Sequence, residues 1–167
     1  MRLSFRQVIV TGLCATLMGI SLLCGCSGAS TVVDDEAAQN RQFMASVNQI
    51  MVAMQSSFDG FNEAVGSGDI VAMKFRLDSV SDCIGQLDKL DAPEDLADIK
   101  QNYVEGVTAL QSAIEAYTAL YSEIASTEDR SAVDMSSFAD RLSEINATYQ
   151  DGIAKLQAGD EAAASKE

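Results

Sequence analysis

Two cysteines separated by one residue, Cys24 and Cys26, stand near the start of this 167-residue chain. Cysteine sulfur can form a disulfide, bind a metal, act as a nucleophile or carry an attached group. The chain has no histidine. A catalytic Ser-His-Asp triad and a catalytic Cys-His pair are therefore excluded. A metal site of carboxylates and histidines inside a helix bundle is excluded for the same reason. The residues that precede the two cysteines narrow the remaining roles.

The segment before these cysteines has the layout of a secretory signal peptide. Arg2 and Arg6 are the only charged residues before Asp34. An uncharged, mostly apolar run of about seventeen residues covers 8–24, followed by small residues. Because a membrane-spanning helix needs roughly twenty apolar residues, this run is short for a permanent span. The pattern predicts an export signal.

The residues Leu23-Cys24-Gly25-Cys26 resemble the lipobox of bacterial lipoproteins. The resemblance covers only the first 26 residues. It implies that the Cys26 sulfur carries a diacylglyceryl group, that cleavage falls between Gly25 and Cys26, and that the mature chain carries at least two acyl chains of the palmitate kind. An ordinary signal peptide, cut nearby at a site such as that after Ala29, and an uncleaved anchor are the alternatives.

The chain that follows the lipobox suits a tether. Residues 27–31 are small and polar, so we expect 26–33 to form a lipidated cysteine with a flexible linker, after a signal peptide over 1–25. Two acyl chains hold a protein firmly on a bilayer, whereas one binds reversibly. The predicted location is the extracytoplasmic face of the cell membrane, on the cell surface or the periplasmic side, with the lipid bilayer bound through acylated Cys26.

The charge of the mature part restricts its partners. It carries 25 acidic and nine basic side chains, which is a formal net charge of −16. Nucleic acids and anionic lipids are bound through Lys and Arg, so this balance argues against both. Cys83 is the one cysteine left besides Cys26, and no internal disulfide is available. We expect Cys83 to pack as a small apolar residue.

Four segments show the apolar spacing of amphipathic helices. Apolar residues recur every three or four positions from Phe43 to Val65, from Ile70 to Leu87, from Leu96 to Ile124 and from Phe138 to Leu156. No segment alternates as a strand does. Gly66-Ser67-Gly68 is predicted to end the first helix, and the second helix is predicted to start at Asp69.

Other residues indicate where the first and third helices start and which segments are not helical. Asp34 is a predicted cap for the first helix. Asp91 and Glu94 have the spacing of a reciprocal cap, with Pro93 in the first turn of the third helix. The polar segment 126–134 is predicted to be a loop, and the small and charged residues 158–167 a disordered tail.

Each apolar stripe must be covered by its neighbours, and the links between the segments are short. The sequence therefore predicts an all-α fold, an antiparallel up-down four-helix bundle over residues 34–157. Its shape resembles that of the four-helix cytochromes of the b562 and c′ type. Those proteins hold haem through an axial histidine or Cys-x-x-Cys-His, which this chain lacks. We therefore expect no cofactor, and the resemblance concerns shape alone.

Two sets of side chains suit ligands. The first consists of the four tyrosines, Tyr103, Tyr117, Tyr121 and Tyr149, on the predicted inner faces of the third and fourth helices. Buried hydroxyls need partners, so these tyrosines can line a pocket for a small apolar or aromatic ligand. Alternatively, each ring lies at a seam of the bundle with its hydroxyl in water.

The second set is rich in sulfur and comprises Met44, Met51, Met54, Met73 and Cys83. Soft sulfur ligands select Cu(I). Methionine is also a routine filler of irregular cores, and these residues lie on or beside the predicted core stripes. Core packing is the preferred interpretation, and no metal site is predicted.

These observations lead to a functional hypothesis. The chain is predicted to be a membrane-anchored bacterial lipoprotein with a non-enzymatic helical bundle that acts as an interaction or scaffold module of the cell envelope, with another envelope protein as partner. A ligand-binding module between the third and fourth helices is the alternative. A copper carrier or a histidine-independent enzyme is a third hypothesis.

Overall fold

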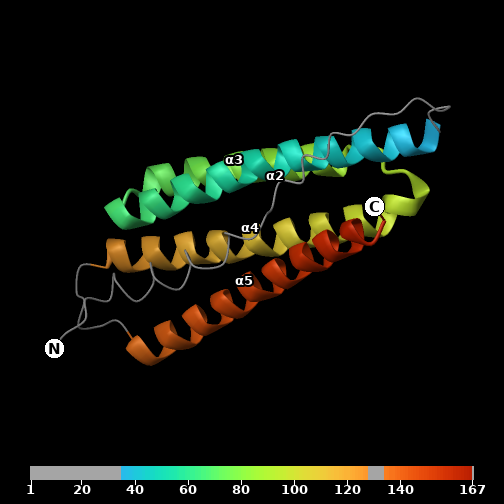
Figure 1. The fold of residues 1–167 in the computed structure, drawn as a ribbon. Helices are drawn as coiled ribbons and strands as arrows, with labels where there is room; N and C mark the ends of the chain where they lie inside the picture. Colours follow the sequence, from blue (N-terminus) through green and yellow to red (C-terminus); the bar gives the residue numbers. More distant parts are fainter. Residues whose placement is uncertain (1–34, 128–133, 167) are drawn as a thin grey trace.

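The computed structural model describes residues 35–127 and 134–166. Nearly all of them belong to four long helices and a short 3-10 turn, namely α2 (Asp35–Ser67), α3 (Ile70–Asp88), η1 (Glu94–Leu96), α4 (Ala97–Ser126) and α5 (Met135–Ala164). In chain order each long helix packs antiparallel on the next (Figure 1). The structure therefore confirms the predicted all-α, antiparallel four-helix bundle.

The two ends of the bundle hold different parts of the chain. The start of α2, the connection from α3 to α4 and the C-terminus lie at one end (Figure 1). The α2–α3 turn, the end of α4 and the start of α5 lie at the other. Among the helices in 35–127 and 134–166, none is long and apolar enough to cross a membrane. Residues 1–34, which include the predicted signal peptide, the tether and Asp34, lie outside the described residues.

The turn between α2 and α3 follows the sequence prediction. The N–H of Gly68 donates to the carbonyl of Val65, and the N–H of Asp69 donates to the carbonyl of Ala64, at 3.2 and 2.9 Å. Gly68 has φ 74°, the left-handed conformation that ends many helices in this way. The Asp69 carboxylate then accepts the N–H of Ala72 at 2.9 Å and caps α3. Thus one short turn ends α2 and starts α3.

The connection from α3 to α4 differs from the prediction. Asp91 and Glu94 do not form a reciprocal cap, because the N-cap of α4 is Leu96, which makes no side-chain capping bond. Leu96 is 2% exposed and packs into the core, so burial sets the start of α4. Lys100 donates to the carbonyls of Asp88 and Leu90 at 2.7 and 2.8 Å. Its cation thereby satisfies acceptors at the C-terminal end of α3.

The core follows the predicted stripes. Their most buried members include Val47 and Met54 from α2, Met73 and Val80 from α3, and Ile99, Val107, Leu110 and Ile114 from α4. The α5 stripe contributes Tyr149, Ile153 and Leu156. Burying each such side chain stabilises the fold by roughly 1.5–3 kcal/mol, which explains why the helices pack in this register.

Helices α4 and α5 approach most closely where two glycines meet. A Cβ built on Gly152 would lie 2.8 Å from the carbonyl oxygen of Gly106, and one on Gly106 would lie 3.0 Å from that of Gly152. Neither site has room for a side chain. Because the backbones touch here, the glycines set the crossing of the two helices.

The predicted disordered tail at 158–167 is wrong over most of its length. Helix α5 continues to Ala164, and Ala162 and Ala163 pack against the core. Gly159 is buried beside the ring of Tyr103. The small residues that suggested disorder let the helix approach α4 closely, so their size favours packing here.

Candidate functional site

The predicted lipobox, with the lipid-carrying Cys26, precedes the first described helix. Leu23, Cys24, Gly25 and Cys26 lie outside the described residues. The structure places only the helix to which they would be joined, since α2 begins at Asp35. The lipobox therefore stays a prediction from sequence, and the described bundle supplies the other candidate sites.

Tyr103 is buried and hydrogen-bonded to α5. It is 5% exposed, and its hydroxyl donates to a carboxylate oxygen of Asp160 at 2.6 Å. Burial is the largest cause that raises the pKa of Tyr103, followed by the hydrogen bond to Asp160 and the negative charge of Asp160. The hydroxyl thus joins α4 to the last turns of α5, rather than reaching water or a ligand.

Tyr117 and Tyr121 belong to an aromatic group farther along α4. Their ring centroids are 6.4 Å apart, and Phe61 of α2 meets Tyr117 edge to face at 6.3 Å. Burial raises the pKa of Tyr117, and the neighbouring Tyr121 adds a smaller electrostatic effect. Tyr149 is 2% exposed within the core. Edge-to-face contact between Phe61 of α2 and Tyr117 of α4 explains the position of Tyr117.

The structure does not bring the four tyrosines together. Tyr103 and Tyr117 are fourteen residues apart on one helix, which separates them by roughly 21 Å along its axis. Tyr103 is also bound to Asp160, near the C-terminal end of α5. Two of the rings therefore form one cluster, while Tyr103 is held elsewhere, and no single small ligand can contact all four.

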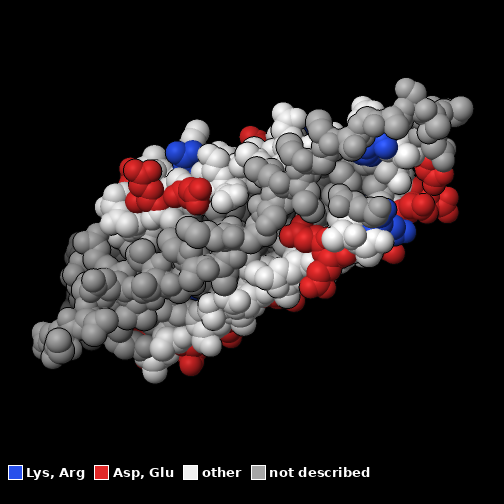
Figure 2. Space-filling view, viewed as in Figure 1, with Lys and Arg blue, Asp and Glu red and all other residues white. Residues whose placement is uncertain are grey.

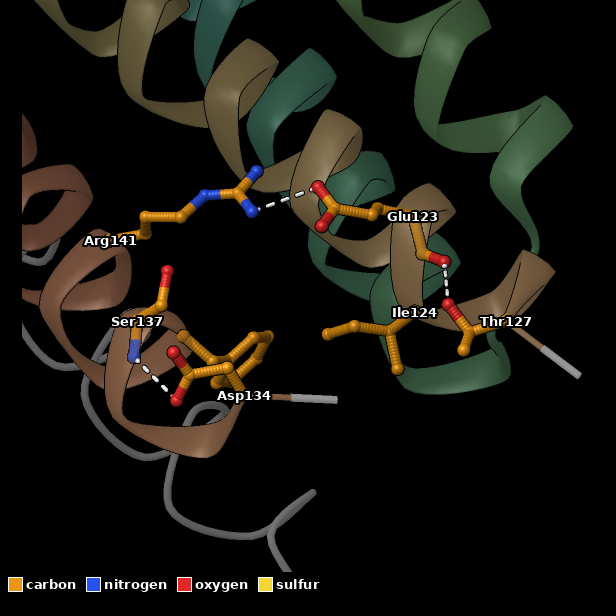
Figure 3. Close-up of a pocket in the computed structure, with 7 residues that line it drawn as sticks. Glu123, Ile124, Thr127, Asp134, Ser137 and Arg141 are labelled. Atoms are coloured by element: carbon orange, nitrogen blue, oxygen red, sulfur yellow. Dashed lines mark hydrogen bonds and ion pairs between the residues drawn. The ribbon is translucent and has the colours of Figure 1, made fainter. Parts of the chain in front are cut away.

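A depression between α4 and α5 lies at the other end of the pair (Figure 3). Its volume is about 170 Å³, and its lining residues are Glu123, Ile124, Thr127, Asp134, Ser137, Phe138 and Arg141. It thus lies between the two helices named by the ligand hypothesis, but none of the four tyrosines lines it. The prediction placed Ile124 and Phe138 on inner faces; it did not select Glu123 or Arg141, because their pairing depends on how the two helices meet.

The polar residues of this depression already have partners. Arg141 and Glu123 form an ion pair of 2.8 Å across it, with exposed fractions of 42% and 61% (Figure 3). Asp134 accepts hydrogen bonds from the Ser136 hydroxyl and from the N–H groups of Ser136 and Ser137, in that order of effect, and they lower its pKa. These bonds cap α5.

The size and chemistry of the depression limit what it can bind. Ligand pockets typically have volumes of about 300–1,000 Å³, so a space of about 170 Å³ suits one side chain rather than a whole ligand. Its carboxylates are engaged by Arg141 and by a helix start. The arrangement is a small depression whose charged side chains already have partners within the protein.

The sulfur-containing residues lie in the core. Met51, Met54, Met73 and Cys83 are buried, and Met44 is partly buried against the same cluster. Burial, and then the charge of Asp82, raise the pKa of Cys83, which favours the neutral thiol. Among the residues in 35–127 and 134–166, no three His, Cys, Asp or Glu side chains are grouped so as to hold a metal ion.

Comparison of the chain with protein-family models, curated proteins and solved structures found no match. Function is therefore argued from the residues of this chain. On the described surface visible in Figure 2, acidic side chains outnumber basic ones. This agrees with the excess of 25 acidic over nine basic residues after Cys26, and it presents a mainly acidic face to partners.

Proposed function

We propose that the protein is a lipid-anchored interaction module on the extracytoplasmic face of a bacterial cell membrane. The observation that carries the proposal is Leu23-Cys24-Gly25-Cys26 directly after an uncharged apolar run with two arginines before it. Cys26 receives the lipid and becomes the first residue of the mature chain. The bilayer is then the first partner of the protein, and a second envelope protein is the partner of its bundle.

Anchoring supplies a way for a domain that is not an enzyme to act. A protein restricted to a membrane surface meets other membrane-bound proteins at a raised effective concentration, so a weak contact suffices. Helix α2 begins nine residues after Cys26, so the described bundle lies within a short tether of the anchor. Its long helices present stable faces at that surface.

The anchor is tested by acyl labelling of the full chain in a bacterial host. Cells are fed a palmitate analogue that can be tagged, and the purified protein is examined by mass spectrometry. We expect a labelled protein whose mature N-terminus is Cys26. Cys26→Ser is expected to abolish the label, whereas the matched control Cys24→Ser should keep it, because Cys24 leaves with the signal peptide.

Either of two results would overturn the anchor. One is a mature N-terminus downstream of Cys26 with no acyl mass. The other is undiminished labelling of the Cys26→Ser protein. Because the described bundle does not include Cys26, neither substitution is expected to change the thermal unfolding of the purified domain, and that measurement serves as the folding control.

A further inference from the structure

Two apolar side chains at the start of α3 face outward. Val71 is 79% exposed and Phe75 is 62% exposed, the highest values among the large hydrophobic residues of the described chain. They are four residues apart and therefore lie on the same face of the helix. Helix α3 buries Met73, Val80, Cys83 and Leu87 instead, so this outer pair is separate from the core.

Two cations flank this pair. Lys74 is exposed beside Phe75, and the guanidinium carbon of Arg76 lies 5.7 Å from the centroid of the Phe75 ring. In α2, Gly60 leaves room for this guanidinium, because a Cβ there would collide with it. Val71, Lys74, Phe75 and Arg76 are together called the α3 patch.

The α3 patch is unusual in a chain with so few cations. Two of the nine basic residues after Cys26 lie in it. In the described part of the chain, neither Lys74 nor Arg76 belongs to an ion pair. Asp69 is occupied as the cap of α3, and Asp78 lies one turn beyond Lys74. The patch is thus a short apolar and cationic surface with acidic borders.

Geometry and charge exclude two occupants. The lipidated cysteine and its predicted tether, 26–33, span at most about 28 Å, whereas α2, with 33 residues, is roughly 50 Å long and starts at the opposite end of the bundle. An extended polyanion or an anionic bilayer would meet the acidic borders and the net charge of −16 that the chain carries after Cys26.

We propose that the α3 patch is the docking surface for a short segment of another envelope protein that presents an apolar side chain next to Asp or Glu. The apolar side chain packs on Val71 and Phe75, and the carboxylate meets Lys74 and Arg76. This inference rests on the proposed function, since it assigns a place and a chemistry to the contact made by the anchored module. Figure 1 shows that α3, whose first turns carry the patch, starts at the end of the bundle opposite the start of α2.

The proposal is tested by site-specific crosslinking of the full chain in cells. A photoreactive phenylalanine analogue replaces Phe75, and in a matched control it replaces Val52, which is 54% exposed on α2. Val52 has no cation within four residues on either side. We expect a crosslink from position 75 to a different protein, at a peptide that contains Asp or Glu, with at least about a tenfold higher yield than from position 52.

Charge reversal tests the chemistry of the contact. Lys74→Glu with Arg76→Glu is expected to reduce the crosslink from position 75 at least about tenfold, because like charges would then face each other. Lys74→Arg with Arg76→Lys should retain it. Lys74 is exposed, whereas Arg76 is half-buried against Gly60, so thermal unfolding of each purified protein checks that the bundle is intact.

Several outcomes would overturn the proposal: no crosslink from position 75, a crosslink only to a second copy or to phospholipid, or a yield that charge reversal leaves unchanged. The same experiment in the Cys26→Ser background separates this inference from the anchor. A crosslink that persists without acylation supports the patch while the lipid proves dispensable. Acyl labelling without any crosslink supports the anchor and refutes the patch.

Discussion

The two ends of the α4–α5 pair differ in how closely the helices approach. At one end Gly106 and Gly152 bring the backbones into contact, and the Tyr103 hydroxyl holds Asp160 at 2.6 Å. At the other end the helices diverge (Figure 1) and leave a depression of about 170 Å³, crossed by the Glu123–Arg141 ion pair. The same two helices are therefore closed at one end and open at the other.

The size of the facing residues explains this difference. Glycines at the crossing let the two backbones meet, although each glycine within a helix costs about 1 kcal/mol relative to alanine. At the open end the facing residues include Glu123 and Arg141, which are much larger than glycine and whose charged groups stay partly in water. The two backbones thus pack closely only near the glycines, and the depression between α4 and α5 lies away from them.

Filling the closed end should have the largest effect. Gly152→Ala puts a methyl group against the Gly106 carbonyl, and overpacking of this kind costs typically 1–3 kcal/mol. The gain in helix propensity offsets only part of this cost. We expect the free energy of unfolding, measured by urea denaturation, to fall by about 2 kcal/mol.

Gly85→Ala is the matched control for this change. Gly85 lies within α3, and a Cβ there would meet no atom within 4 Å. Its replacement should therefore raise the free energy of unfolding by about 0.5–1 kcal/mol. If the two substitutions stabilised the protein equally, the glycine contact would not set the closed end.

Removing the hydroxyl at the closed end should have an intermediate effect. Tyr103→Phe loses the bond to Asp160 but keeps the ring, so the free energy of unfolding should fall by about 1 kcal/mol. Asp160→Ala should cost a similar amount. In the double variant, the two losses should not add, because each removes the same bond. Additive losses would show that the bond contributes nothing.

The same tyrosine should make stability depend on pH. Because the folded pKa of Tyr103 is raised, the unfolded chain loses this proton first, above the ordinary value of about 10. The contribution of Tyr103 to the free energy of unfolding should therefore be fully present below pH 10 and fall above it. Urea denaturation at several alkaline pH values should show a shallower fall for Tyr103→Phe than for the parent.

Breaking the ion pair at the open end should have the smallest effect. Arg141 and Glu123 are 42% and 61% exposed, and exposed pairs contribute about 0.2–1 kcal/mol. Arg141→Ala should lower the free energy of unfolding by no more than about 0.5 kcal/mol. The loss should shrink further in high salt, because ions screen exposed charges.

Lys155→Ala provides the matched control at the closed end. Lys155 contacts Glu105 and Asp151 at 3.3 Å, so its removal should also cause a small, salt-sensitive change. If Arg141→Ala instead cost as much as Gly152→Ala, the open end would be a tightly packed part of the fold. The contrast between the two ends would then be lost.

The helices and their inner faces could be predicted because their signals are local. The three-to-four residue spacing that includes Val47, Val80 and Leu110 identifies the buried side of each helix, and all three are buried. The second helix was predicted to start at Asp69 from its position after Gly68, and Asp69 is the residue that caps α3. Phe75 had a signal too, since it is apolar and lies off the stripe of α3.

The predictions that proved wrong concern residues whose neighbours come from distant parts of the chain. The tail beginning at 158 was predicted from its composition to be disordered. In the structure Asp160 accepts a hydrogen bond from Tyr103 of α4, and Gly159 lies beside the ring of Tyr103. A reciprocal cap by Asp91 and Glu94 was predicted, but α4 starts after Leu96, which is buried in the core. Tertiary packing outweighed the local pattern in each case.

The sequence alone specifies four amphipathic helices, their buried faces and the turn at Gly68, because each follows from residues close together in the chain. It also supplies the prediction of an acylated Cys26, which depends on a short motif. Only the folded bundle decides that Gly106 meets Gly152, that Tyr103 binds Asp160 and that the far end stays open. Those contacts join separate helices, and their register follows from the shapes of both partners.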